Sequence, residues 1–356
     1  MNVQTRREPA PSPPARVAAQ STPAWREVAA APAVALVTVV AGLIATHEAG
    51  FSFRDPDNVA AGYFALVGAA VLLLVGLDVW LRAARRTGST RPPRAALEAV
   101  RRERWTRRRA VPVAIALLSF YVTYLAYRNL KGALPLLRPG DLFDAQLTDA
   151  DKLLAFGHEP WELSHAVLGG WLPTQILSTF YAAFIVFLPL TLALALVFSP
   201  SLQGSLFYAT TLSVNWVLGI VSYYLLPSLG PVYAQPGDFA GLPHSEVTRL
   251  QEMLLDQRTA FLADTASGTP QAIAAFASLH IAMSFAALLM AYLLRLGRRW
   301  KVALWGWLGM TWVATVHFGW HYVVDDVAGL AMGGTAILIA RALTGIDLRR
   351  VAGPAR

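Results

Sequence analysis

Long apolar runs alternate with short polar segments along most of the chain. A helix needs about 20 mainly apolar residues to cross the hydrocarbon core of a bilayer, and runs of this length recur. The turn-forming sequence at 199–205 divides the longest uncharged stretch into two such runs. The pattern predicts an all-α integral membrane protein of about eight transmembrane helices, at 28–46, 59–81, 110–127, 174–198, 206–226, 276–294, 302–320 and 323–340.

The composition agrees with a lipid environment, since 55% of the 356 residues are hydrophobic and only 15% are charged. The absence of cysteine excludes disulfides, thiolate metal sites and cysteine nucleophiles. The net charge of +8 does not indicate a nucleic-acid partner, because the basic residues form no footprint on a soluble face. Residues 1–27 lack the features of a signal peptide, and we expect a disordered cytoplasmic tail there.

Basic segments fix the expected topology. The segment 82–109 holds eleven arginines against two glutamates, and 295–301 and the C-terminal tail are also basic. An even number of predicted spans separates these segments, so the positive-inside rule places all of them, with both termini, in the cytoplasm. We expect a multi-pass protein of the plasma (inner) membrane, and we interpret the basic loop as a topology determinant that attracts anionic headgroups.

Three groups of polar residues then fall on the extracytoplasmic face. KGALPLLRP contains Lys131 and Arg138 just beyond the third span, and ASLH places Ser278 and His280 at the start of the sixth. His321 and Asp325 are four residues apart, on one face of a predicted helix between the seventh and eighth spans. Ionisable groups at membrane depth are costly, so their convergence indicates a functional site.

This order and spacing resemble the type 2 phosphatidic acid phosphatase superfamily, whose signature is K-x6-R-P, then P-S-G-H, then S-R-x5-H-x3-D. The resemblance runs from residue 131 to residue 325. The sequence departs from the signature at two places, where Ala277 and Leu279 replace Pro and Gly, and Ala314 and Thr315 replace Ser and Arg.

The SLH form, the missing third-motif arginine, PSLGPVY at 227–233 and D-x-x-L-x-F-G-x-x-P at 151–160 resemble the inositol phosphorylceramide synthase-like (inositolphosphotransferase) branch. That branch transfers a phospho-headgroup between lipids. The resemblance implies a six-helix catalytic core at 110–343. Two extra helices and the basic loop at 28–109 would precede it, and a cytoplasmic tail at 344–356 would follow.

The resemblance also implies roles for the polar residues. His321 would attack phosphorus and form a phosphohistidine, while Asp325 orients its imidazole. His280 would protonate the leaving oxygen and then act as base toward the acceptor. Phosphate would be bound by Lys131, Arg138 and Ser278. No metal or cofactor is required, and further candidates for substrate contact or support of the site are His317, Thr315 and Tyr233.

The missing arginine bears on the substrate. A phosphomonoester approaches two negative charges near neutral pH and a phosphodiester carries one, so a site with one fewer cation suits a diester and favours a transferase. Another residue could fold back to replace the charge, and the candidates are Arg128, His317, Arg249 and Arg258.

Structural interpretations stay open for the same residues. His321 with Asp325 could tie two helices together, Ser278 could cap its helix, and Lys131 and Arg138 could be interfacial anchors. HFGWH could form a zinc pair, which the absence of a supporting glutamate motif disfavours. Other expectations are a cap or solvent-facing role for Asp326, amphipathic interfacial helices or a plain loop at 141–165, and a lid or binding loop at 227–275.

The sequence therefore predicts a phosphotransferase that moves a phospho-alcohol headgroup, with phosphoinositol as a candidate, from a phospholipid donor to a lipid or glycan hydroxyl. A lipid phosphate phosphatase using the same site is the alternative, and a transporter or channel is a remote one. The expected partners are the bilayer and these substrates, with no nucleic acid.

Overall fold

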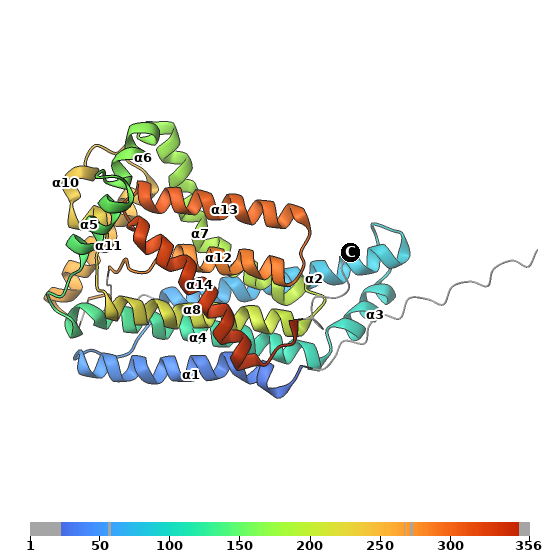
Figure 1. The fold of residues 1–356 in the computed structure, drawn as a ribbon. Coiled ribbons are helices and arrows are strands. Elements are labelled where there is room, and N and C mark those ends of the chain that lie inside the picture. Colours follow the sequence, from blue (N-terminus) through green and yellow to red (C-terminus); the bar gives the residue numbers. More distant parts are fainter. Residues whose placement is uncertain (1–22, 56–57, 267, 271–272, 349–356) are drawn as a thin grey trace, which may run out of the picture.

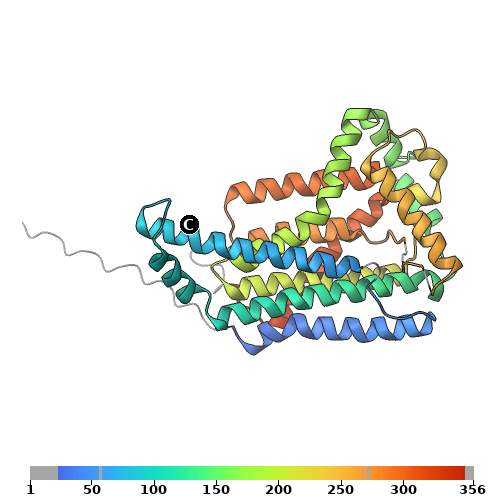
Figure 2. The same ribbon diagram turned by 180° about the vertical axis from the view of Figure 1, so that it is seen from behind.

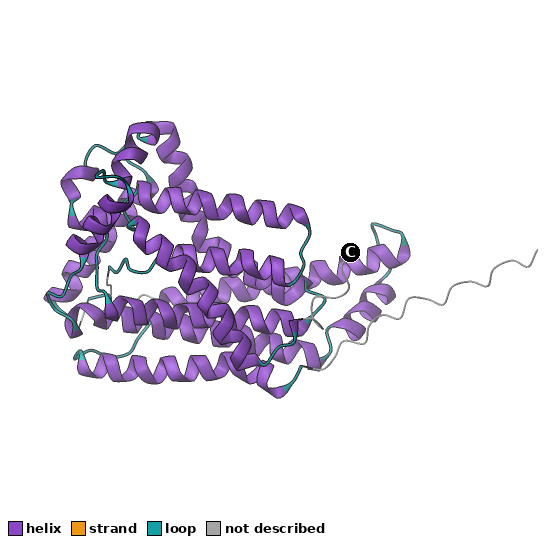
Figure 3. Cartoon of the chain, viewed as in Figure 1, coloured by secondary structure: helices purple, strands orange, loops and turns teal. Residues whose placement is uncertain are grey.

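A computed structural model describes residues 23–348 except 56–57, 267 and 271–272. All regular secondary structure in these residues is helical (Figure 3). Most of the long helices run roughly side by side in one bundle, which α14 crosses obliquely (Figure 1). They are α1 (Trp25–Glu48), α2 (Val59–Thr87), α4 (Arg107–Leu137), α7 (Trp171–Phe198), α8 (Leu202–Leu225), α12 (Leu279–Leu293), α13 (Arg298–His317) and α14 (Val323–Thr344).

Six of these helices are long and apolar enough to cross a membrane, namely α1, α2, α4, α7, α8 and α14. The prediction of transmembrane helices is confirmed for these six, and a count of eight is not. Helix α12 is apolar but has only 15 residues. Helix α13 begins with basic residues and is rich in tryptophan, which lowers its mean hydropathy.

The bundle is built around α8, the most buried of the six apolar helices. Two of its buried hydroxyl groups are satisfied within the helix, since Thr210 and Thr211 each donate to the carbonyl four residues earlier. A buried helix in lipid needs such internal pairing. Helix α1 packs against α4 and α8, whereas α2 packs against α7 and touches α4 (Figure 2).

Short helices cover one end of the bundle (Figure 1). They are α5 (Asp144–Leu154), α6 (Pro160–Leu168), α9 (Pro231–Ala234), α10 (Pro236–Phe239) and α11 (Glu246–Ala263). The helices expected at 141–165 are thus confirmed. Helix α3 (Arg94–Arg104) lies at the opposite end, together with the first turn of α1 and the C-terminal end of the described chain. The basic segment and both ends of the described chain therefore share one end of the bundle.

Two predicted boundaries need correction. Helix α4 continues to Leu137, so Lys131 lies inside this helix and not beyond it. Helix α1 already begins at Trp25, within the expected N-terminal tail. The rest of that tail, 1–22, and most of the expected C-terminal tail, 349–356, lie outside the described residues.

Candidate active site

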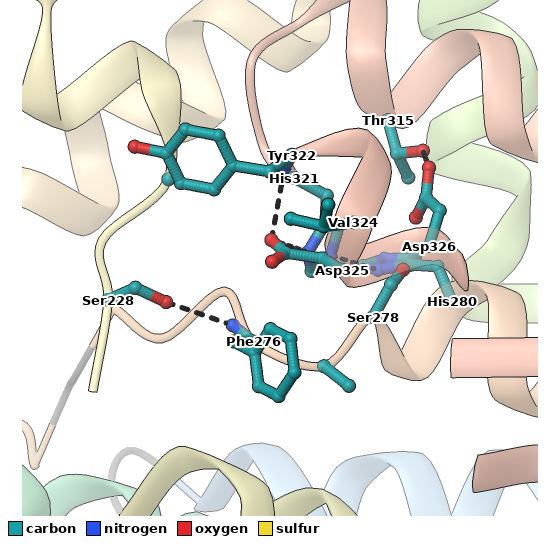
Figure 4. Close-up of polar contacts among 12 residues, drawn as sticks. Ser228, Phe276, Ser278, His280, Thr315, His321, Tyr322, Val324, Asp325 and Asp326 are labelled. Atoms are coloured by element: carbon teal, nitrogen blue, oxygen red, sulfur yellow. Dashed lines mark hydrogen bonds and ion pairs between the residues drawn. The ribbon is translucent and has the colours of Figure 1, made fainter. Parts of the chain in front are cut away.

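Two histidines meet at the end of the bundle that the short helices cover. His280 lies in the first turn of α12, and His321 lies in the loop between α13 and α14. Nδ1 of His280 is 3.4 Å from Nε2 of His321, and the ring centroids are 5.5 Å apart (Figure 4). The sequence prediction that these imidazoles come together is confirmed.

Asp325 contacts the other side of the His321 ring. Its Oδ2 lies 3.4 Å from His321 Nδ1 and accepts the Tyr322 N–H at 3.0 Å. The prediction of one shared helical face is wrong, because His321 precedes α14 and Asp325 reaches back over the first turn of that helix. A carboxylate at Nδ1 favours the tautomer protonated there, which leaves the Nε2 lone pair directed toward His280.

Asp151 in α5 holds the start of α14. Its carboxylate accepts the N–H groups of Val323 at 2.7 Å and Val324 at 2.9 Å. These amides have no partner inside their own helix, and a negative charge at a helix N-terminus is favourable. A side chain 172 residues away in sequence thus fixes the turn that carries Asp325.

Asp144, also in α5, fixes the His321 loop from a second direction. It accepts the N–H groups of Leu229 at 3.0 Å and Gly230 at 2.9 Å, and the Tyr322 hydroxyl at 3.0 Å. At Gly230, φ is 94°, and a Cβ there would come within 2.5 Å of the Trp320 carbonyl oxygen. The PSLGPVY stretch can therefore pack this closely only with glycine at that position.

Sequence reasoning missed these two aspartates as positioning residues. Asp151 opens the D-x-x-L-x-F-G-x-x-P motif, and Asp144 precedes it by two helical turns, so both lay in a stretch already singled out. The available signal was the acidic spacing of seven residues, which places both carboxylates on one face of a helix. Their partners are backbone amides, which leave no trace in side-chain patterns.

A cavity of about 490 Å³ borders both histidines. Its wall is mostly aromatic and aliphatic and comes from α2, α4, α7, α8 and α11. Two cations of α4, Arg128 and Lys131, also line it. The ammonium of Lys131 lies 5.6 Å from the centroid of the Tyr223 ring, within cation–π range.

Burial and the positive charge of Lys131 lower the pKa of His321 to about 3. Both effects disfavour the imidazolium, since burial penalises charge and a neighbouring cation repels it. The ring is therefore neutral near pH 7, the form whose nitrogen lone pair can attack phosphorus.

Two predicted phosphate ligands are engaged elsewhere. Nε of Arg138 donates to Asp141 at 2.9 Å and its Nη1 to the Tyr224 carbonyl at 2.5 Å, and the residue lines a separate small cavity. Ser278 is fully buried, and its hydroxyl accepts the Ile281 N–H at 3.4 Å as the N-cap of α12. Neither side chain lines the cavity beside the histidines.

His317 is likewise separate from the cavity. Ser164 Oγ lies 2.9 Å from its Nδ1, Thr174 Oγ1 lies 3.3 Å from its Nε2, and its carbonyl is 2.8 Å from Nε2 of His165. Both ring nitrogens of His317 are thus occupied by neighbours, an arrangement that fits support of the site. In the described part of the chain, no three histidine, aspartate or glutamate side chains gather as a metal site.

The remaining candidates have structural partners. Thr315 donates to Asp326 Oδ2 at 3.0 Å, and the Tyr233 hydroxyl donates to the Gln251 carbonyl at 3.1 Å. Asp326 is fully buried, so the expectation of a cap or solvent-facing group is wrong. These contacts join α13 to α14 and α9 to α11 around the site.

Comparison with known proteins gives one family. A model described as the PAP2 superfamily matches residues 145–339, more than half of the chain, and includes both histidines and Asp325. No curated protein and no solved structure matches the chain. The match begins after Lys131 and leaves the branch within the superfamily undetermined. By this match, and with the signature histidines in contact beside an apolar cavity, the chain belongs to the PAP2 superfamily, whose members are generally phosphatases or phosphotransferases.

Proposed function

We propose that the protein is a phosphotransferase that moves the phospho-alcohol headgroup of a phospholipid to a hydroxyl acceptor through a phosphohistidine at His321. The observation that carries the proposal is the 3.4 Å approach of the His280 and His321 imidazoles at the border of a largely apolar cavity. Phosphoryl transfer needs a nucleophile, a proton donor for the leaving oxygen and positive charge near the phosphate, all of which this arrangement supplies.

The reaction proceeds in two displacements. Nε2 of His321 attacks phosphorus, the bond from phosphorus to the lipid alcohol oxygen breaks, and His280 gives that oxygen its proton. The acceptor hydroxyl then attacks the phosphohistidine, its proton passes to His280, and the nitrogen–phosphorus bond breaks. Asp325 holds the His321 ring throughout and stabilises the charge on it.

The cavity wall supports a lipid donor. Aromatic and aliphatic side chains cover most of it, and the cations of Arg128 and Lys131 border the same space. An acyl chain can bury against the apolar part while the phosphate meets the cations and His321. A phosphodiester headgroup fits the missing third-motif arginine, and phosphoinositol stays our candidate.

We also propose that the site opens toward the extracytoplasmic side of the plasma (inner) membrane. The arginine-rich segment 82–109 lies at the end of the bundle opposite the histidines, and such segments stay in the cytoplasm. Cysteines introduced singly at 156 and 88 test this, since an impermeant thiol reagent on intact cells should label only the former. The reverse labelling would overturn the orientation.

Turnover of headgroup-labelled phosphatidylinositol by the purified protein, with and without lipid alcohols, tests the activity. We expect an acceptor-dependent labelled lipid, no such product with His321→Ala, and an acid-labile adduct of the phospho-alcohol headgroup on His321 in mass spectrometry. Release of inorganic phosphate from phosphatidic acid without an acceptor-dependent product would identify the lipid phosphate phosphatase instead. Ion or solute flux that persists in His321→Ala, without turnover of either lipid, would favour a transporter.

A further inference from the structure

We propose that Arg128 supplies the second positive charge on the bound phosphate and that Asp55, from the loop between α1 and α2, positions it. This inference rests on the proposed phosphotransferase function. It gives the loop between α1 and α2, which precedes the family match, a part in the active site.

The first argument is location. Arg128 precedes Lys131 by three residues in α4, so both side chains project from one face of that helix. Both line the cavity that also touches His280 and His321. A phosphate bonded to His321 Nε2 would therefore lie on the side of the site that these two cations border.

The second argument is the absence of a competing acceptor. The nearest carboxylate oxygen to Arg128 Nη1 is Oδ1 of Asp55 at 3.7 Å, too long for a hydrogen bond. Only 15% of the Arg128 side chain is exposed, and its Nη1 is buried and makes no hydrogen bond to any described residue. A buried donor without an acceptor is costly, and a phosphate oxygen would satisfy it.

The third argument is the way Asp55 is held. Its carboxylate accepts the N–H groups of Ala60 at 2.9 Å and Ala61 at 2.7 Å, in the first turn of α2. Next to it, the Arg54 backbone exchanges two hydrogen bonds with the Asn129 side chain, at 3.0 and 2.9 Å. Asn129 directly follows Arg128, so this clamp sets the loop against α4 and places Asp55 opposite the guanidinium.

The other candidates for the missing charge lie outside the histidine cavity. Arg249 pairs with Glu246 on an exposed part of α11, and Arg258 lines the small cavity that Arg138 also lines. The ring nitrogens of His317 are bonded to Ser164 and Thr174. Of the four candidates, Arg128 alone borders the histidine cavity.

Inhibition by orthovanadate, a phosphate analogue, tests the role of Arg128 in the purified full-length chain. Arg128→Gln is expected to lower kcat/KM by about 100-fold and to weaken vanadate inhibition by about tenfold, as for loss of a charge-assisted contact to the reacting group. Arg138→Gln is the matched control, with an expected loss of less than about threefold in vanadate affinity. The opposite ranking of the two variants would overturn the assignment.

A double-mutant cycle tests Asp55 as a positioning residue. Asp55→Asn removes the charge beside Arg128 and keeps one of the two oxygens that accept the Ala60 and Ala61 N–H groups, so its effect on α2 is the same in both backgrounds. We expect kcat/KM to fall about fivefold in the natural background and not at all in Arg128→Gln, because coupled residues are non-additive. An equal loss in both backgrounds would mean that Asp55 acts only on α2, which contradicts the proposal.

The variant His321→Ala distinguishes a failure of the proposed function from a failure of the role assigned to Arg128. If it matches the natural protein in turnover, the phosphotransferase mechanism fails and the role of Arg128 fails with it. If His321→Ala is inactive while Arg128→Gln retains full kcat/KM and vanadate affinity, the mechanism stands and only the assignment of Arg128 is wrong.

Discussion

The molecule contains two histidine pairs at the same end of the bundle, each with one buried and one half-buried ring. The rings of His280 and His321 lie 5.5 Å apart, and those of His165 and His317 lie 5.1 Å apart. Both rings of the first pair border the cavity, whereas His317 uses both ring nitrogens on Ser164 and Thr174. The pairs are alike in composition and separation and differ in whether both rings border the cavity.

By the proposed mechanism, this difference separates a reactive histidine from a structural one. An imidazole can attack phosphorus only with a free lone pair, and His321 Nε2 lies 3.4 Å from Nδ1 of His280 at the border of the cavity. His317, at the end of α13, instead ties that end to α6 and α7. Burial and a second imidazole do not by themselves make a catalytic site.

The largest expected effect comes from removing the reactive ring. His321→Ala should lower kcat by about 10³-fold or more, the scale seen when a nucleophile is removed. Its thermal unfolding midpoint should change little, because the ring already borders a cavity and its contacts with His280 and Asp325 are long, at 3.4 Å each. Turnover and thermal unfolding are measured on the same preparation. A folded variant with normal turnover would show that His321 is not the nucleophile.

The structural pair should respond in the opposite way. His317→Ala leaves a cavity and unpairs buried hydroxyls, so it should destabilise the protein by about 2–4 kcal/mol. Its folded fraction should keep kcat/KM within about threefold, since the ring lies outside the cavity. Thermal unfolding, measured together with activity per folded molecule, tests this. A stable but inactive variant would show that His317 takes part in the reaction.

The pH dependence sharpens the contrast further. With the pKa of His321 lowered to about 3, protonation of the nucleophile should reduce kcat/KM only well below the ordinary histidine value of about 6.5. Lys131→Met removes a nearby positive charge, which raises the pKa of His321 and moves this acid limb to higher pH. Profiles of kcat/KM against pH for both proteins measure the shift, and an unmoved limb would exclude Lys131 as its cause.

Much of the site could be predicted from sequence, because hydropathy locates helix ends and the His280, His321 and Asp325 motifs all fall at such ends. Arg138 shows the limit. It follows Lys131 by seven residues, which would place both on one helical face, but α4 ends at Leu137. Arg138 has φ −131° and ψ 60°, so the chain turns there and its side chain reaches Asp141 instead.

Asp144 and Asp151 show a second limit. An acidic side chain on an amphipathic helix normally faces water, and the seven-residue spacing that puts these two on one face does not show that this face is buried. Their partners are amides 85 and 172 residues further along, which only the packing of α5 on the His321 loop brings near. Contacts to backbone atoms depend on tertiary structure and not on the identity of the partner residue.

One wall of the cavity is formed by Tyr63, Phe64 and Val67 of α2. These residues lie well before position 145, where the family match begins, whereas the reacting histidines lie inside it. Under the proposed function, part of the wall that receives the lipid and the two histidines that react with its phosphate are thus encoded in different stretches of the gene. Substitutions in α2 would then change the choice of lipid without altering those histidines.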